Sequence, residues 1–157
     1  MTEPEEIIEA QLMAALVAGN VGVPVEGMLT PAAPGAEKLS APTRIVVAVD
    51  LASQDLDWEG PGVPCAWSAR VAVRYSAPDD SSGINFRAVC RAVRATLRTY
   101  LGDACTALNG GGFNCDAFLL GATSTTFEDD GAGGAFVKIY PVTLNGRFIP
   151  PTTEEAQ

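Results

Sequence analysis

The sequence predicts an α+β protein: a single, mainly antiparallel sheet, an N-terminal helix and one central amphipathic helix packed on it, and a long C-terminal β-hairpin. Three observations predict this class. Apolar residues recur every three or four positions near the N-terminus and again in residues 83–103, as on a helix. The runs between and after these segments are β-branched or alternate in polarity, as in strands. The order helix, strands, helix, paired strands is typical of one sheet with helices on one face.

Composition predicts one globular domain over residues 1–157. The chain is 47% hydrophobic and 18% charged, which suits a buried core and not a disordered chain. Nineteen acidic against ten basic residues give a formal net charge of −9, and such a field repels nucleic acid and anionic membranes. The N-terminus is acidic where a signal peptide is basic, and the longest apolar run, residues 45–49, is too short for a bilayer. We therefore expect synthesis in the cytoplasm and no membrane partner.

The first helix is predicted to begin at a capping box in residues 2–5, with proline in its first turn. It ends at residues 19–20, a Gly-Asn pair. Its inward face consists of Ile8, Leu12 and Leu16, with Met13 as a fourth candidate. The acidic residues at its start interact favourably with the helix dipole and are expected to be solvated. They are Glu3, Glu5, Glu6 and Glu9.

The next segments predict one short and two long strands. A proline-rich connection, residues 21–43, contains a short strand at residues 25–29. Residues 43–53 form a β-branched strand, buried in part on both faces. Residues 58–65 are predicted to be a loop, and the alternating run 67–77 a strand. The latter has Trp67, Ala69, Val71, Val73 and Tyr75 on one face, and Arg70 and Arg74 on the other.

The central helix carries two stripes. We expect Ser81 or Ser82 to cap it and Gly102 to break it. Its apolar stripe is Phe86, Val89, Cys90, Val93, Leu97 and Leu101, and its basic stripe is Arg87, Arg91, Arg94 and Arg98. No acidic residue lies three or four positions from these arginines within the helix, so they lack local partners. The basic stripe is therefore either a solvated helix face or a contact surface.

The C-terminal third predicts two long strands, residues 113–127 and 134–149. The acidic, glycine-rich tip between them, residues 128–134, is expected to be mobile in a free subunit and ordered on assembly. The proline-led tail, residues 150–157, is expected to be mobile.

The sequence contains no catalytic or metal-binding signature. Without histidine there is no imidazole base and no usual zinc partner. The acidic pairs, at residues 79–80 and 128–130, lie in predicted turns that are too solvated for general acid catalysis. The acidic tip lacks the ligand spacing of an EF-hand, although a calcium loop there remains an alternative. We expect no enzyme, no cofactor and no metal.

The cysteines lack CxxC spacing. We expect buried or free thiols, because the cytosol is reducing. A Cys105–Cys115 disulfide is the alternative, and Cys65 and Cys90 are the other two cysteines.

Three segments together resemble the tail terminator (tail completion) proteins of long-tailed bacteriophages. They are EEIIEAQLMAAL (5–16), ARVAVRYSAPD leading into FRAVCRAVRATL (69–97), and the hairpin FLLGATSTTFEDDGAGGAFVKIYPVTLNGRF (118–148). The resemblance implies a structural virion protein of the tail or neck, assembled in the host cytoplasm. It implies a homo-oligomeric ring, typically a hexamer, that caps the tail tube, stops addition of tail tube protein and meets the head–tail connector protein. DNA would pass through the lumen without specific binding.

A ring needs head-to-tail contacts between different faces of the subunit. The expected interface residues are Arg87, Arg91, Arg94, Arg98, Glu128, Asp129 and Asp130. One alternative is a neck or head–tail connector ring, or another minor tail protein. An alternative of another class is a small cytoplasmic ligand-binding module, which predicts a monomer with a well-formed apolar pocket.

Overall fold

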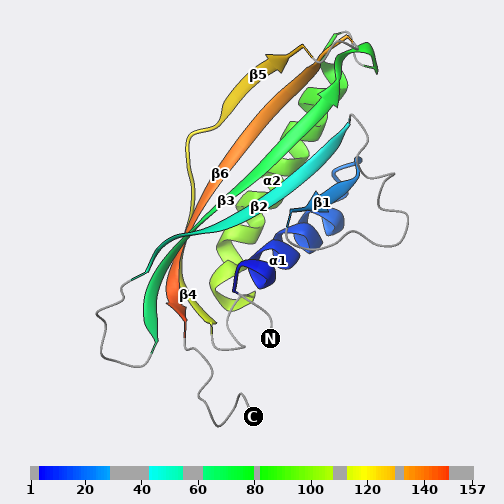
Figure 1. Cartoon of the computed structure of the whole chain (residues 1–157). Helices are drawn as coiled ribbons and strands as arrows, with labels where there is room; N and C mark the ends of the chain where they lie inside the picture. Colours follow the sequence, from blue (N-terminus) through cyan, green and yellow to red (C-terminus); the bar gives the residue numbers. More distant parts are fainter. Residues whose placement is uncertain are drawn as a thin grey trace, which may run out of the picture.

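The computed structural model describes residues 4–28, 43–54, 62–79, 82–107, 113–129 and 133–148. The predicted α+β class is confirmed, with two helices packed on a mostly antiparallel sheet (Figure 1). The expected mobile tail (150–157) and the Thr2 end of the capping box lie outside these ranges. The elements in order are α1 (Pro4–Ala18), β1 (Val25–Gly27), β2 (Arg44–Gln54), β3 (Val63–Ser76), a 3-10 turn (Ala77–Asp79), α2 (Ile84–Ala107), β4 (Phe113–Leu120), β5 (Ser124–Glu128) and β6 (Ala135–Phe148).

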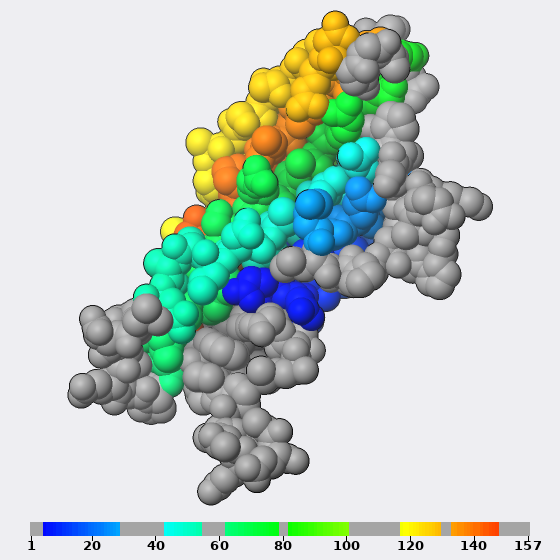
Figure 2. All heavy atoms as spheres, viewed as in Figure 1, coloured from blue at the N-terminus to red at the C-terminus, as the bar shows by residue number. Residues whose placement is uncertain are grey.

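The sheet has the strand order β1-β2-β3-β6-β4, and β5 pairs with β6 beyond β4. The β1–β2 pair is parallel and the other pairs are antiparallel. Both helices lie on one face of the sheet (Figure 1). Figure 2 shows the opposite face, where β2, β3, β6 and β5 lie side by side with no described helix over them.

The core lies between the helices and the sheet. On α1, Ile8, Leu12 and Leu16 are fully buried, as the helical spacing predicts. On β3, alternate residues from Trp67 to Val73 are buried while Arg70 is exposed, as the two-residue period predicts. Apolar residues of β2 and β6 lie opposite them in register, so three neighbouring strands bury one continuous face. These are Ile45, Val47, Val49, Tyr140, Val142 and Leu144.

Two predicted boundaries are wrong. Residues 63–65, expected to be loop, belong to β3, because their backbones pair with β6 from Val63↔Phe148 onward. Helix α2 continues through Gly102 to Ala107. An interior glycine costs a helix only about 1 kcal/mol, which packing of α2 against the sheet can offset.

The predicted strand over residues 113–127 is two strands, β4 and β5, because of Pro141 on β6. Gly121 N–H donates to the Pro141 carbonyl at 2.8 Å, so this side of Pro141 faces the outer strand. A residue's N–H and C=O point to the same side of a strand, and proline has no N–H to give. The outer strand therefore loses a ladder hydrogen bond here. β4 ends at Leu120, opposite Val142, and β5 begins at Ser124, opposite Ile139.

The acidic start of α1 is less solvated than predicted. Glu9 is fully buried and packs against Gly27 of β1, where a β-carbon would overlap its carboxylate. Glu5 accepts a hydrogen bond from the Trp67 indole N–H at 3.0 Å. Two acids expected on the surface therefore join α1 to the sheet.

Candidate interaction surface

The four arginines of α2 form one exposed surface, which we call the arginine surface: Arg87, Arg91, Arg94 and Arg98. The predicted apolar stripe of the same helix faces the core, with Phe86, Val89, Cys90, Val93 and Leu97 buried; the Leu101 side chain lies outside the described set. The Arg87 guanidinium donates to the Ser82 carbonyl at 3.2 Å. Among the residues that the structure describes, no carboxylate forms a salt bridge with any of the four.

Part of the arginine surface lines a groove of about 300 Å³ between α2 and the β5–β6 pair, which we call the cationic groove. Four cations line it: Arg87, Arg91 and Arg94 from α2, and Lys138 from β6. Arg98 is not among its lining residues. The other lining residues are Phe86, Cys90, Thr125 and Tyr140. The groove therefore combines positive charge with a partly aromatic floor.

Hydrogen bonding and ring packing hold this floor in place. The Tyr140 hydroxyl donates to the Cys90 carbonyl at 2.9 Å, which ties β6 to α2. Lys138 Nζ lies 5.7 Å from the centroid of the Tyr140 ring, within the range of a cation–π contact. Phe86 stacks on Phe136 with centroids 5.4 Å apart. A ligand would meet a preformed surface.

The two weak acids of the floor stay neutral at physiological pH. Burial raises the pKa of the Cys90 thiol, and the opposing effects of the Tyr140 hydrogen bond and the Lys138 charge are smaller. Burial, followed by the charge and hydrogen bond of Cys90, raises the pKa of Tyr140, while Arg94 lowers it by less. The charge of the groove is therefore that of its cations.

Of the acidic residues expected at the interface, Glu128 has a partner within its own chain. Glu128, at the end of β5, forms a salt bridge with Arg74 of the same chain. Arg74 alternates with the buried Val73, so this pair lies on the sheet face away from α2. Asp129 is exposed, and Asp130 lies outside the described residues.

Sequence reasoning missed Lys138, Thr125 and Tyr140 as parts of the surface. The sequence does contain an indication for Lys138. Alternate residues of β6 lie on one face of the strand, and Lys138 shares that face with Phe136, Tyr140 and Val142. A lysine among apolar residues of one strand face indicates a charge at the margin of the core.

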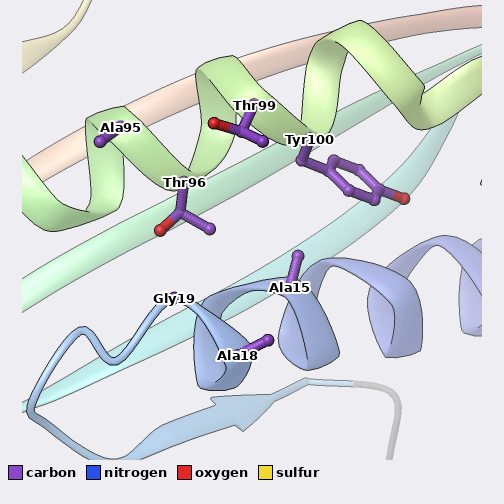
Figure 3. Close-up of a pocket in the computed structure, with 7 residues that line it drawn as sticks. All are labelled: Ala15, Ala18, Gly19, Ala95, Thr96, Thr99 and Tyr100. Atoms are coloured by element: carbon purple, nitrogen blue, oxygen red, sulfur yellow. The ribbon is translucent and has the colours of Figure 1, made fainter.

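A second groove, of about 430 Å³, lies between α1 and α2 (Figure 3). No charged side chain lines it. Its residues are Ala15, Ala18, Gly19, Ala95, Thr96, Thr99 and Tyr100. Small side chains here let the two helices approach closely, and a β-carbon at Gly19 would lie 3.1 Å from Thr96 Cγ2. Close helix packing accounts for this composition.

Within the described ranges, no three His, Cys, Asp or Glu residues are grouped so as to hold a metal ion. None of the helices there is long and apolar enough to cross a bilayer.

Comparisons with known proteins identify no family. No protein-family model matches the chain. No curated protein matches it. One solved structure, described as "Virion of native gene transfer agent (GTA) particle", contains a chain that is 16% identical with a TM-score of 0.42, over 90% of this chain and 91% of that one.

Proposed function

We propose that the protein is a structural subunit of a phage-like particle that assembles into a ring through its arginine surface, as in the tail terminator proteins that it resembles. One observation carries this proposal. Four of the ten basic residues stand exposed on one helix, without a carboxylate partner among the described residues, in a chain of net charge −9.

A head-to-tail contact would use this surface well. Like charges three and four positions apart on a helix destabilise it by a few tenths of a kcal/mol per pair. A carboxylate-bearing face of a neighbour would offset that repulsion. Two different faces that complement each other generate a ring when the rotation closes. Six copies is the ring size that the resemblance suggests.

In the particle, the ring would cap the tail tube and present its other side to the head–tail connector. DNA would cross the lumen, and the acidic net charge would limit adhesion of the duplex to the wall. A neck or connector ring is the nearest alternative role. Purified rings that bind tail tubes support the terminator role, whereas rings that bind only portal complexes support the connector role.

Charge reversal tests the surface. Arg91→Glu with Arg98→Glu keeps the helix, because glutamate is nearly as good a helix former as arginine. We expect the double variant to raise the concentration for half-maximal assembly by at least about tenfold at low salt, and by less at high salt, because salt screens exposed charges. The measurement is assembled mass against concentration by analytical ultracentrifugation.

Arg70→Glu is the matched control, since Arg70 is exposed on the sheet face away from the helices. Like each substitution in the double variant, it replaces a positive charge with a negative one. We expect its concentration for half-maximal assembly to stay close to that of the parent. If the double variant assembles like the parent at every salt concentration, the arginine surface is only a solvated face.

A small-molecule binding module is the candidate from another class, and the apolar groove between α1 and α2 is the observation that favours it. Its volume of about 430 Å³ falls within the usual range of ligand pockets. This function predicts a monomer at all concentrations and stabilisation by an apolar ligand. Ring assembly without such a ligand favours the structural role.

A further inference from the structure

We infer that β5 of one copy pairs antiparallel with β5 of a second copy, so that Phe127 and Asp129 of each copy lie over the cationic groove of the other. The inference goes beyond the proposed ring, because the contact is two-fold and follows from the edge of the sheet. Both contacts would use the arginine surface, so the pair belongs to subunits outside a ring.

The outer edge of β5 is open among the residues that the structure describes. β5 pairs with β6 on one side, and Figure 1 shows it at the margin of the sheet with no described element beyond it. All five of its residues are exposed. Its sequence, STTFE, contains no lysine or proline, which natural edge strands use to prevent pairing. Such an edge is a template for a further strand.

The ladder with β6 shows which backbone groups of β5 point outward. The Pro141 carbonyl accepts from Gly121, so Pro141, Ile139 and every second residue before them direct their N–H and C=O groups toward the outer strands. Their partners in register, Ser124, Thr126 and Glu128, therefore bond to β6. The residues between them, Thr125 and Phe127, direct both backbone groups away from β6.

The side chains of these two residues lie on the face of the sheet that carries α2. Thr125 lines the cationic groove together with residues of α2. The Phe127 ring meets the Phe136 ring edge-on, with centroids 5.5 Å apart, and Phe136 stacks on Phe86 of α2. Phe127 is nevertheless 56% exposed. A strand added along this edge would cover Phe127 and place alternate side chains on the groove side.

One register of two β5 strands uses both outward-facing residues. Antiparallel pairing centred on Thr126 sets Thr125 of each copy opposite Phe127 of the other. Residues with outward backbone groups then face each other, and each such pair exchanges both N–H···O bonds. The two Thr126 residues face each other as a non-hydrogen-bonded pair on the two-fold axis.

This register places an aromatic ring on the groove. Phe127 of the second copy lies opposite Thr125, which is itself paired with Lys138 of β6. Thr125 and Lys138 both line the groove. Aromatic and β-branched side chains opposite each other stabilise a strand pair, and the methylene stem of lysine adds apolar surface.

The same register brings a carboxylate to the arginines. Asp129 is exposed and follows Phe127 by two residues, so in the second copy it lies opposite Thr123 and on the groove side. Thr123 precedes Ser124, the partner of Ile139, and is therefore level with Tyr140. Tyr140 and Arg94 line the same part of the surface. A charge-assisted Asp129–Arg94 hydrogen bond would form twice, once on each side of the axis.

A second copy is the occupant because β5 carries its own complement. The edge presents a threonine beside a lysine, and then arginines. The strand that follows it back presents an aromatic ring and, two residues later, an acid. The opposite edge of the sheet, β1, has only three residues and offers a shorter ladder.

A cysteine on the two-fold axis tests the register directly. Non-hydrogen-bonded partners have Cα atoms about 4.5 Å apart, within the range of a disulfide. We therefore expect Thr126→Cys to form a cross-linked dimer under mild oxidation with copper phenanthroline, measured on non-reducing gels. A head-to-tail ring contact joins different positions of the two copies and does not bring Thr126 to itself.

Ser124→Cys is the matched control, on the same face of the same strand. In this register the two copies of residue 124 are four residues apart along the ladder, or ~13 Å, which is beyond disulfide reach. We expect Thr126→Cys to cross-link at least about tenfold faster than Ser124→Cys. The parent protein measures the background from the native cysteines.

Thr125→Pro tests the backbone pairing. The Thr125 N–H points away from β6, so proline removes the outward donor and leaves the ladder with β6 intact. In the Thr126→Cys background we expect cross-linking to slow at least about tenfold, with an unchanged circular dichroism spectrum.

Charge exchange tests the Asp129–Arg94 contact and does not depend on the proline variant folding. In the Thr126→Cys background, Asp129→Lys and Arg94→Glu should each slow cross-linking at least about threefold at low salt. Combining them restores opposite charges across the axis and should recover most of the parental rate. A combined variant slower than either single variant overturns the contact.

The results separate this pair from the ring. A parent that forms rings while Thr126→Cys cross-links no faster than Ser124→Cys overturns the inference and leaves the ring intact. Fast cross-linking of Thr126→Cys that Thr125→Pro abolishes supports the pair, whether or not rings form. Equal cross-linking with and without a correctly folded Thr125→Pro overturns it.

Discussion

At the scale of single residues, a few close contacts join the helices to each other and to the sheet. The Trp67 indole bonds to Glu5, and Gly27 leaves room for the buried Glu9. Gly19, just after α1, faces Thr96 of α2, whose hydroxyl donates to the Ala92 carbonyl at 2.8 Å. At Gly19 and at Gly27 the neighbouring side chain leaves no room for a β-carbon.

Gly19→Ala tests the approach of the two helices. Its β-carbon would overlap the Thr96 hydroxyl and press on Thr96 Cγ2. We expect a loss of about 1–3 kcal/mol in the free energy of unfolding, as for other overpacked sites. Adding Thr96→Ala removes both atoms and should recover part of the loss in urea denaturation. If Gly19→Ala is as stable as the parent, α1 and α2 do not pack as described.

The thiols give a second prediction at this scale. Cys65 and Cys90 are free and buried, and burial raises the pKa of both thiols, with the Glu5 charge adding a smaller rise at Cys65. Because the thiolate is the reactive form, a raised pKa lowers reactivity at neutral pH. We expect these two to react slowly with a thiol reagent in the folded protein, and faster as pH rises toward their pKa.

In denaturant without reductant, the count of free thiols should be four. Cys105 and Cys115 have side chains outside the described set, so their state remains a prediction. A count of two would contradict this prediction and favour the Cys105–Cys115 disulfide.

Residue roles were only partly predictable from sequence. The buried positions Ile8, Leu12, Leu16 and Trp67 follow from periodicity, because period decides which face meets the core. The helical pattern predicts a solvated Glu9, because a local pattern cannot show that a glycine on another element leaves space for a carboxylate. Lys138 was missed because the groove joins elements that are distant in sequence.

At the scale of elements, one proline divides the outer edge of the sheet. Pro141 cannot donate to the outer strand, so β4 and β5 pair with successive parts of β6. The sequence shows this proline, but which edge it interrupts depends on the strand order. That order, with β6 between β3 and β4, is a nonlocal property that periodicity does not determine.

The hairpin tip gives a prediction at this scale. Deleting residues 130–133 leaves Asp129 and Gly134 between β5 and β6, and Asp-Gly is a favoured two-residue hairpin connection. We expect a folded subunit with impaired assembly or tube docking, measured by circular dichroism and by assembled mass. Normal assembly of the deletion variant would show that the tip does not contact a neighbour.

Glu128 is a matched control for that deletion, because its partner lies in the same chain. Glu128→Gln removes the salt bridge to Arg74. The Glu128 side chain is 54% exposed and the Arg74 side chain is 20% exposed. Exposed pairs contribute at most about 1 kcal/mol, so stability should change by less than that. A larger loss in thermal denaturation would mean that the pair orders the whole hairpin end.

At the scale of the whole molecule, charge is distributed unequally. Basic residues gather on the arginine surface and Lys138, while the chain as a whole is acidic. The basic stripe could be predicted from sequence, since helical spacing alone produces it. The groove with its aromatic floor could not be predicted in this way, because β5 and β6 form the side of the groove that faces α2.

The most direct test of the account is the mass and shape of the purified parent protein. Sedimentation equilibrium across a range of concentrations, with electron microscopy of the same sample, measures both. The account predicts a closed assembly, six times the 16.3 kDa mass of the chain if the resemblance gives the ring size, with a central opening. A species of 16.3 kDa at every concentration and at low salt would contradict it.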